Sequence, residues 1–351
     1  MDCAVVNTLA FRRRLDELQV RMEPLIPPTD TEPRSVAAPS VSELVNATWT
    51  LAALWLLMDA ASRDEITGKF TPLPGSREIF DVSAQVLVAS RLATVTDGEC
   101  RLEPHVASAV DAIGSDAFAA HIGATLGQVG SVPQEVDQMA APDARWAQTP
   151  TSVLEAQGRR SALLARVFFD EVLPHFPELA ARLVDERCWF LDAGCGTAQL
   201  TLAMVAELPN LAAVGLESQS VPYGLAVRNV ERAGQSARIE VVRTRVEEFA
   251  SDREFDLAWL PLDFIAPSSA LFAAVERVHT RLGEGGVVFA AAPAPDESLE
   301  ASCARLRCTL WRGEPLDAGF VEGLMVDIGF RRVGRISLSR GLDMVYAAKG
   351  A

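Results

Sequence analysis

The second half of the chain shows a regular alternation of short apolar runs and helical segments, beginning at about Arg187. This alternation is typical of a mainly parallel sheet with helices on both faces. The last two apolar runs are separated only by Arg340-Gly341-Leu342, which is short enough for a hairpin. The predicted strands are Cys188–Ala193, Leu211–Glu217, Ala237–Arg243, Phe255–Leu260, Val287–Ala292, Phe330–Ser339 and Asp343–Ala348. The pattern therefore predicts an α/β domain whose parallel sheet ends in an antiparallel hairpin.

A smaller and mainly helical domain is expected in front of this sheet. One helix lies between Leu44 and Met58, and a second covers about Arg77 to Ser90. The next segment, Leu92 to Leu102, has Asp97-Gly98 at its centre and predicts a two-stranded hairpin. Helices followed by such a hairpin indicate a winged-helix-like unit.

The first residues predict a separate amphipathic helix. Phe11, Leu15, Leu18 and Met22 share one face at helical spacing, and this stripe is suited to pack on the body of the protein or on a second copy. A proline-rich segment, Pro27 to Pro33, then reads as an extended linker. The expected organisation is an N-terminal helix and linker at 1–40, a winged-helix-like domain at 41–150 and the α/β domain at 151–351.

The formal net charge of −15 argues against a nucleic acid or an anionic membrane as the main partner. A winged helix often binds DNA, but the second predicted helix carries Glu78 and Asp81 and has only Arg77 and Arg91 as cations. This is a poor match to phosphates. We therefore expect a domain for interaction or for covering a substrate, and no nucleic-acid partner.

Cysteine usage and apolar runs indicate a cytoplasmic protein without a membrane span. Six cysteines in 351 residues show no regular framework, which is typical of reduced thiols. Cys303 and Cys308 lie five apart without a second pair, so no metal site is expected. The start of the chain lacks the pattern of a signal peptide, and the most apolar run, Leu51 to Met58, is too short to cross a bilayer.

A glycine-rich turn follows the first strand of the α/β domain. Asp192 ends an apolar run, and Gly194 and Gly196 follow before the next helix. Two residues without side chains let the backbone approach a ligand and leave the helix N-terminus open. Glu217 lies 21 residues after Gly196, at the end of the next strand, where a carboxylate can accept from both hydroxyls of a ribose. The combination indicates a site for an adenosine-containing cofactor.

The C-terminal half, from about residue 154 to 351, resembles the class I S-adenosylmethionine-dependent methyltransferases. The motifs that carry the resemblance are "LDAGCGTA", the acid of "VGLE", "EFDLAWLP", "RLGEGGVVFAA" and the "GF" before the final hairpin. The resemblance implies a Rossmann-like, seven-stranded sheet with a reversed last strand. It also implies that Asp192, Gly194 and Gly196 line the methionine end of the cofactor and that Glu217 holds the ribose.

The helical domain in front makes the chain similar to natural-product O- and N-methyltransferases. In that group the N-terminal domain dimerises and helps to close the pocket over a small-molecule substrate. The resemblance therefore implies a homodimer, and a heteromer with a related chain remains an alternative. The motif "AQGR" also resembles that group, and it places Gln157 and Arg159 on a helix that is suited to cover the polar tail of the cofactor.

Arg245 departs from the family pattern. An Asp at this position commonly accepts a hydrogen bond from the adenine amino group, whereas a guanidinium has only donors. Either backbone amides and apolar contacts hold the adenine while Arg245 turns to solvent, or Arg245 binds a carboxylate, phosphate or sulfate. The second interpretation raises the question of whether S-adenosylmethionine is the cofactor.

Candidates for catalysis stand after the fourth strand, in "WLPLDF". Trp259 and Asp263 are the best placed by position, with Asp263 as a candidate base or a loop-capping acid. The histidines lie in helical or connecting segments without a motif, although His121 or His175 could face the cleft.

Three functions follow from these observations. The main hypothesis is a methyltransferase for a small molecule, in secondary-metabolite biosynthesis. The first alternative is a non-methylating displacement, cyclisation or elimination on a sulfated or phosphorylated intermediate, with Arg245, Arg159 and Arg160 as anion holders. The second alternative is a non-catalytic pseudo-methyltransferase that stabilises a second subunit.

Overall fold

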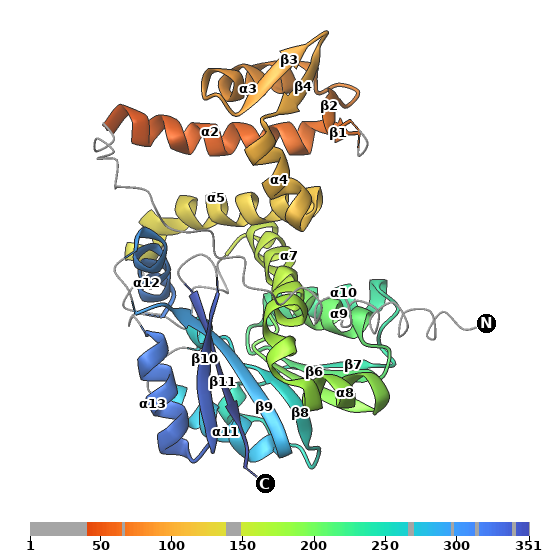
Figure 1. The fold of residues 1–351 in the computed structure, drawn as a ribbon, viewed down its shortest axis with the longest axis vertical. Helices are drawn as coiled ribbons and strands as arrows, with labels where there is room; N and C mark the ends of the chain where they lie inside the picture. The colour runs from red at the N-terminus through yellow and green to blue at the C-terminus, as the bar shows by residue number, and fades with distance from the viewer. Residues whose placement is uncertain are drawn as a thin grey trace, which may run out of the picture. The chain divides into compact units, whose positions relative to one another are not determined.

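In a computed structural model the chain forms two compact units, one within Glu23–Gly130 and the other made mainly of Ser131–Ala351. The predicted N-terminal helix and the linker lie outside the described residues. The structure describes residues 41–64, 67–137, 149–265, 270–295, 298–312, 316–338 and 342–350 (Figure 1).

The first unit combines helices with a small antiparallel sheet. Its helices are α2 (Val41–Ala60), α3 (Arg77–Ala89), α4 (Pro104–Ile113) and the start of α5 (Ser115–Asp137). Its strands are β1 (Ala61–Arg63), β2 (Lys69–Pro72), β3 (Ala93–Thr96) and β4 (Glu99–Leu102), in the order β1-β2-β4-β3. The expected hairpin is confirmed, because β3 and β4 pair across Asp97 and Gly98, which both have positive φ. Strands β1 and β2 were not predicted.

The second unit is built on a seven-stranded sheet of order β10-β11-β9-β8-β5-β6-β7. The strands are β5 (Cys188–Ala193), β6 (Leu211–Leu216), β7 (Ile239–Val242), β8 (Phe255–Trp259), β9 (Leu282–Pro293), β10 (Arg332–Leu338) and β11 (Leu342–Ala348). Strands β5 to β9 are parallel, and β11 pairs antiparallel with β9 and with β10. The prediction of a parallel sheet with an antiparallel hairpin is confirmed.

Helices cover both faces of this sheet (Figure 1). One apolar core contains residues of α7 (Thr151–Val167), α8 (Pro177–Asp185), α9 (Gln199–Glu207) and α10 (Ser220–Arg232), and the other contains residues of α11 (Leu271–Arg281) and α13 (Ala318–Ile328). Neighbouring strand residues alternate between the cores, with Phe190 in the first and Leu191 in the second. Burial on both faces explains why these strands are continuous apolar runs. Helix α12 (Leu299–Arg312) follows β9.

The strand order places a switch point beside β5. The chain runs outward from β5 through β6 to β7, then crosses to β8 on the other side of β5. Ligands of such sheets bind at the carboxyl ends of the strands next to this point. The ends of β5, β6, β7 and β8 are therefore where the site is expected.

Candidate functional site

The loop from β5 to α9 has the two glycines that the sequence singles out. Gly194 has φ +116° and approaches the end of β8 so closely that a Cβ would lie 2.8 Å from Pro261 Cγ. Gly196 has φ +56°, and a Cβ there would meet no atom within 4 Å. The first glycine is required for close packing against β8, whereas the second borders open space at the edge of the sheet.

Asp192 and Glu217 stand at the ends of adjacent strands. Asp192 is buried, and its Oδ2 accepts from Thr201 Oγ1 at 2.6 Å. Glu217 is half-buried, and its Oε1 accepts from the Gln219 backbone N–H at 2.7 Å. The Glu217 carboxylate also interacts favourably with the backbone N–H of Gly196. The structure thus brings the predicted acid, Glu217, directly to the glycine loop.

Burial changes the acid strength of both carboxyl groups. Burial raises the pKa of Asp192 to about 7, although the hydrogen bond from Thr201 opposes this shift. Burial likewise raises the pKa of Glu217 to about 7, against hydrogen bonds from backbone N–H groups. Burial raises the pKa of the Cys195 thiol well above its usual range, and the charges of Asp192 and Glu217 raise it further. The thiol therefore stays protonated, and a cationic ligand would favour the charged form of the acids.

Helix α7 packs directly on the glycine loop at Gly158. A Cβ at Gly158 would overlap the hydroxyl of Thr197 and lie 3.1 Å from Gln199 Cγ. Asn229 of α10 donates to the Thr197 carbonyl at 3.1 Å and to Glu155 of α7 at 3.4 Å. The sequence analysis did not predict this contact between α7 and the glycine loop. A glycine in the middle of a helix, Gly158, is the feature of the sequence that could have indicated it.

The two α7 residues assigned to the cofactor flank Gly158. Gln157 is half-buried, its carbonyl accepts from Ser161 Oγ at 3.0 Å, and Arg159 is exposed. Their role as a cover for the cofactor remains a prediction.

Arg245 lies beyond the end of β7 and pairs with an acid. Its Nε donates to Glu247 Oε1 at 2.5 Å, and 32% of its side chain is exposed. Sequence reasoning did not identify Glu247. The pairing offsets the charge of the guanidinium, so Arg245 does not stand at this edge as an isolated cation.

The two catalytic candidates lie at the end of β8 and in the turn that follows it. Trp259 is the last residue of β8, half-buried, and is registered with Asp192 on β5 and Phe289 on β9. The backbone of Asp263 lies in the 3-10 turn Leu262–Phe264, and its side chain is outside the described residues. Trp259 is thus at the carboxyl edge with Asp192, and a catalytic role for either candidate remains a prediction.

The histidines are divided between the units. His175 is exposed, and His279 on α11 packs against the ring of Phe330 with centroids 4.6 Å apart. His105 and His121 belong to the first unit.

Comparison with protein families identifies this part of the chain. Residues 190–286 match the family of methyltransferase domains. This part of the chain is therefore similar to a methyltransferase domain. The match begins within β5 and ends within β9, so it includes the glycine loop, Glu217 and Arg245. No curated protein matches the chain in sequence.

Solved structures of low sequence identity share the fold. An O-methyltransferase family protein from Burkholderia thailandensis is 13% identical with a TM-score of 0.58, over 90% of this chain and 99% of that one. Human N-acetylserotonin methyltransferase, in complex with S-adenosylmethionine, is 13% identical with a TM-score of 0.57, over 90% of this chain and 100% of that one. NcsB1, an O-methyltransferase from neocarzinostatin biosynthesis solved with S-adenosylmethionine and 2-hydroxy-5-methyl naphthoic acid, is 17% identical with a TM-score of 0.55, over 89% and 100%. The chain has the class I methyltransferase fold.

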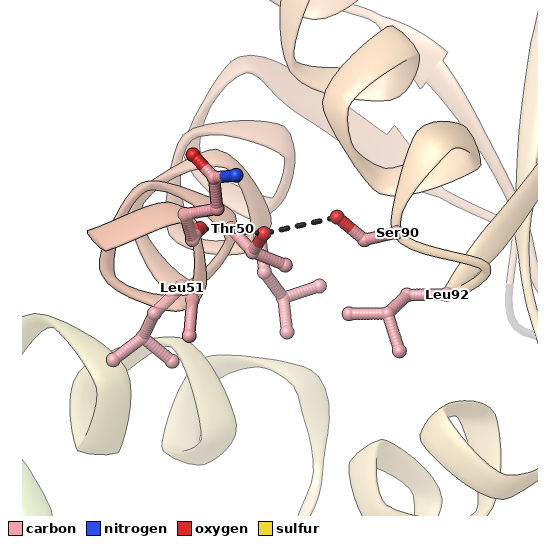
Figure 2. Close-up of a pocket in the computed structure, with 7 residues that line it drawn as sticks. Thr50, Leu51, Ser90 and Leu92 are labelled. Atoms are coloured by element: carbon pink, nitrogen blue, oxygen red, sulfur yellow. Dashed lines mark hydrogen bonds between the residues drawn. The ribbon is translucent and has the colours of Figure 1, made fainter. Parts of the chain in front are cut away.

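A cavity of about 450 Å³ lies in the first unit, outside the methyltransferase domain. Its walls are mainly apolar, with Leu51 and Leu54 of α2 and Leu92 after α3. The hydroxyls of Thr50 and Ser90, which also line it, are hydrogen-bonded to each other at 2.9 Å (Figure 2). It contains none of the predicted site residues.

Neither membrane spans nor metal clusters are found in the described part of the chain. Its helices are too short or too polar to cross a membrane. Its His, Cys, Asp and Glu residues form no group of three that could hold a metal ion.

Proposed function

We propose that the protein transfers a methyl group from S-adenosylmethionine to a small molecule. The observation that carries the proposal is the open space beside Gly196, next to the carboxylate of Glu217 at the carboxyl edge of the sheet. The methyltransferase domain supports the same assignment, as do the human and NcsB1 structures with this cofactor.

The residues at this edge suit an adenosine-containing cofactor. Thr197 Oγ1 is buried and has no hydrogen-bond partner among the described residues. We assign the ribose to Glu217, because an ionised carboxylate can accept from two hydroxyls. The methionine end is assigned to Asp192, Gly194 and Gly196, with Gln157 and Arg159 as its cover.

The chain contributes alignment and exclusion of water. The cofactor, when bound, supplies a methyl group on a sulfonium sulfur. Holding the acceptor in line with that methyl group accounts for most of the acceleration. Leu260, Pro261 and Leu262 are buried after β8, and with Trp259 they form a dry boundary for the acceptor. A hydroxyl acceptor also needs a base within hydrogen-bond reach, a role that we assign to Asp263.

The acceptor class and the assembly belong to the same proposal. NcsB1 acts in the biosynthesis of a natural product, and we infer a secondary metabolite as the acceptor here. We also infer a homodimer formed through the first unit, which light scattering after size-exclusion chromatography would test. A heteromer with a related chain would elute with a second polypeptide.

The non-methylating alternative requires Arg245 as a cation for a sulfate or phosphate group. Its ion pair with Glu247 offsets that charge, so this observation does not favour the alternative. The non-catalytic alternative would be supported by cofactor binding without methyl transfer to any of a panel of phenols, carboxylic acids and amines.

Calorimetry with S-adenosylmethionine and S-adenosylhomocysteine tests the proposal. The wild-type protein is expected to bind both, and Gly196→Val to bind at least about tenfold more weakly, because the side chain fills the open space and strains a positive φ. Gly234→Val is the matched control, since Gly234 has φ +66° with no atom near its Cβ and lies at the opposite edge, before β7. Absence of wild-type binding at high micromolar concentration would sink the proposal.

A further inference from the structure

A charged pair stands at the end of β7, where the family pattern has an acceptor. Arg245 and Glu247 are joined by a hydrogen bond of 2.5 Å, with 32% and 19% of their side chains exposed. The pair is therefore partly withdrawn from water, where hydrogen bonds to a ligand are stronger than in bulk solvent.

Backbone contacts anchor the segment that carries this pair. The Glu217 N–H donates to the Val242 carbonyl of β7 at 3.1 Å, so the segment after β7 starts beside the acid assigned to the ribose. Val246, between the two charged residues, is buried. Arg277 of α11 donates from Nε to the Glu247 carbonyl at 3.2 Å. Contacts on both sides thus anchor the turn that carries the pair.

We propose that the Arg245–Glu247 pair reads the purine base of the cofactor. Glu247 accepts from the exocyclic amino group of adenine, and Arg245 donates to the adjacent ring nitrogen. The base follows the ribose in adenosine, and β7 is the strand next to β6, whose end carries Glu217. The inference rests on the proposed function and names the residues that select its cofactor.

The chemistry of the two side chains explains why both are needed. The pairing edge of adenine presents a donor beside an acceptor. An ionised carboxylate only accepts and a guanidinium only donates, so neither side chain alone matches this edge. Held together, they match it. A site built to satisfy such groups rejects an analogue that reverses them, because buried polar atoms are then left unpaired.

S-inosylhomocysteine is the analogue that tests this reading. Its base has a carbonyl in place of the amino group and a hydrogen on the adjacent nitrogen, so its donor and acceptor are reversed. Calorimetry would compare it with S-adenosylhomocysteine on the wild-type protein, on Glu247→Gln and on Glu248→Gln. Glu248 is the exposed neighbour in the same turn and serves as the matched control.

The wild-type protein and Glu248→Gln are expected to prefer S-adenosylhomocysteine by about tenfold or more. In Glu247→Gln the adenosine ligand should bind more weakly, and its preference over the analogue should fall at least about threefold, because an amide can also donate to the analogue's carbonyl. Arg245 still opposes the hydrogen on the ring nitrogen of the analogue, so part of the preference should remain. Equal wild-type affinities, or wild-type preference in a folded Glu247→Gln, would overturn the inference. Failure of the wild-type protein to bind S-adenosylhomocysteine would instead overturn the proposed function. The wild-type comparison requires no variant to fold, and circular dichroism with urea midpoints would verify the two variants.

Discussion

Gly158→Ala probes the contact between α7 and the glycine loop. The new Cβ would overlap Thr197 Oγ1 and would lie 3.1 Å from Gln199 Cγ and 3.3 Å from Thr197 Cβ. Thr197 is 3% exposed, so its side chain has little room to move. Overpacking of this kind destabilises a protein by about 1–3 kcal/mol. Because alanine is a better helix former than glycine by about 1 kcal/mol, part of that loss is offset.

Gly224→Ala isolates the overpacking contribution. Gly224 also lies in a helix, α10, but a Cβ there meets no atom within 4 Å. The helix-propensity gain is common to both variants, so their free energies of unfolding should differ by the overpacking alone, about 1–3 kcal/mol. Gly224→Ala should be more stable than wild type and Gly158→Ala clearly less stable than Gly224→Ala.

Urea denaturation followed by tryptophan fluorescence would measure this difference, since Trp189 and Trp259 lie in β5 and β8 of the same unit. Adding Thr197→Ala to Gly158→Ala removes the overlapping hydroxyl and should recover part of the loss. Equal stability of the two alanine variants within about 0.5 kcal/mol would refute the packing argument.

Two further predictions concern charged groups of the methyltransferase domain. The pKa of Asp192 is raised to about 7 in the folded protein, so the folded state binds its proton more tightly than the unfolded chain does. The contribution of Asp192 to the free energy of unfolding is then greatest below about pH 4 and falls as the pH rises towards 7. In Asp192→Asn this contribution to the pH dependence should be absent from urea midpoints measured across that range. Arg238→Ala should lower the free energy of unfolding by about 2–3 kcal/mol, measured by urea denaturation. The control Arg232→Ala, at an exposed arginine of α10, should change it by less than about 0.5 kcal/mol. Equal effects of the two substitutions would contradict the reasoning. The Arg238 guanidinium donates to four carbonyls, those of Val205, Leu208, Pro209 and Leu211.

Some strands were beyond prediction from the local pattern. Strands β1 and β2 have seven residues between them, of which only Phe70 is buried, so no alternation marks them. Strand β9 begins at Leu282, five residues before the predicted start at Val287. The prediction missed this first part because it contains Gly283, Gly285 and Gly286, which are poor strand formers. Gly286 lies in close contact with the Phe255 carbonyl, where a Cβ would be 2.8 Å away. That requirement comes from a neighbouring strand and leaves only a weak strand signal in the sequence.

The sequence by itself determined the strands of the parallel sheet, the hairpin at Asp97-Gly98 and the loop with its acid. These features follow from local chemistry, namely burial on both faces, positive φ at a turn and a carboxylate at a strand end. Only the tertiary structure decided what stands beside them. Thr197 meets Gly158 because α7 folds back on the loop, and Arg245 meets Glu247 because extended backbone enters a 3-10 turn. Residues two apart do not face each other on a helix, so their partnership depends on this backbone path.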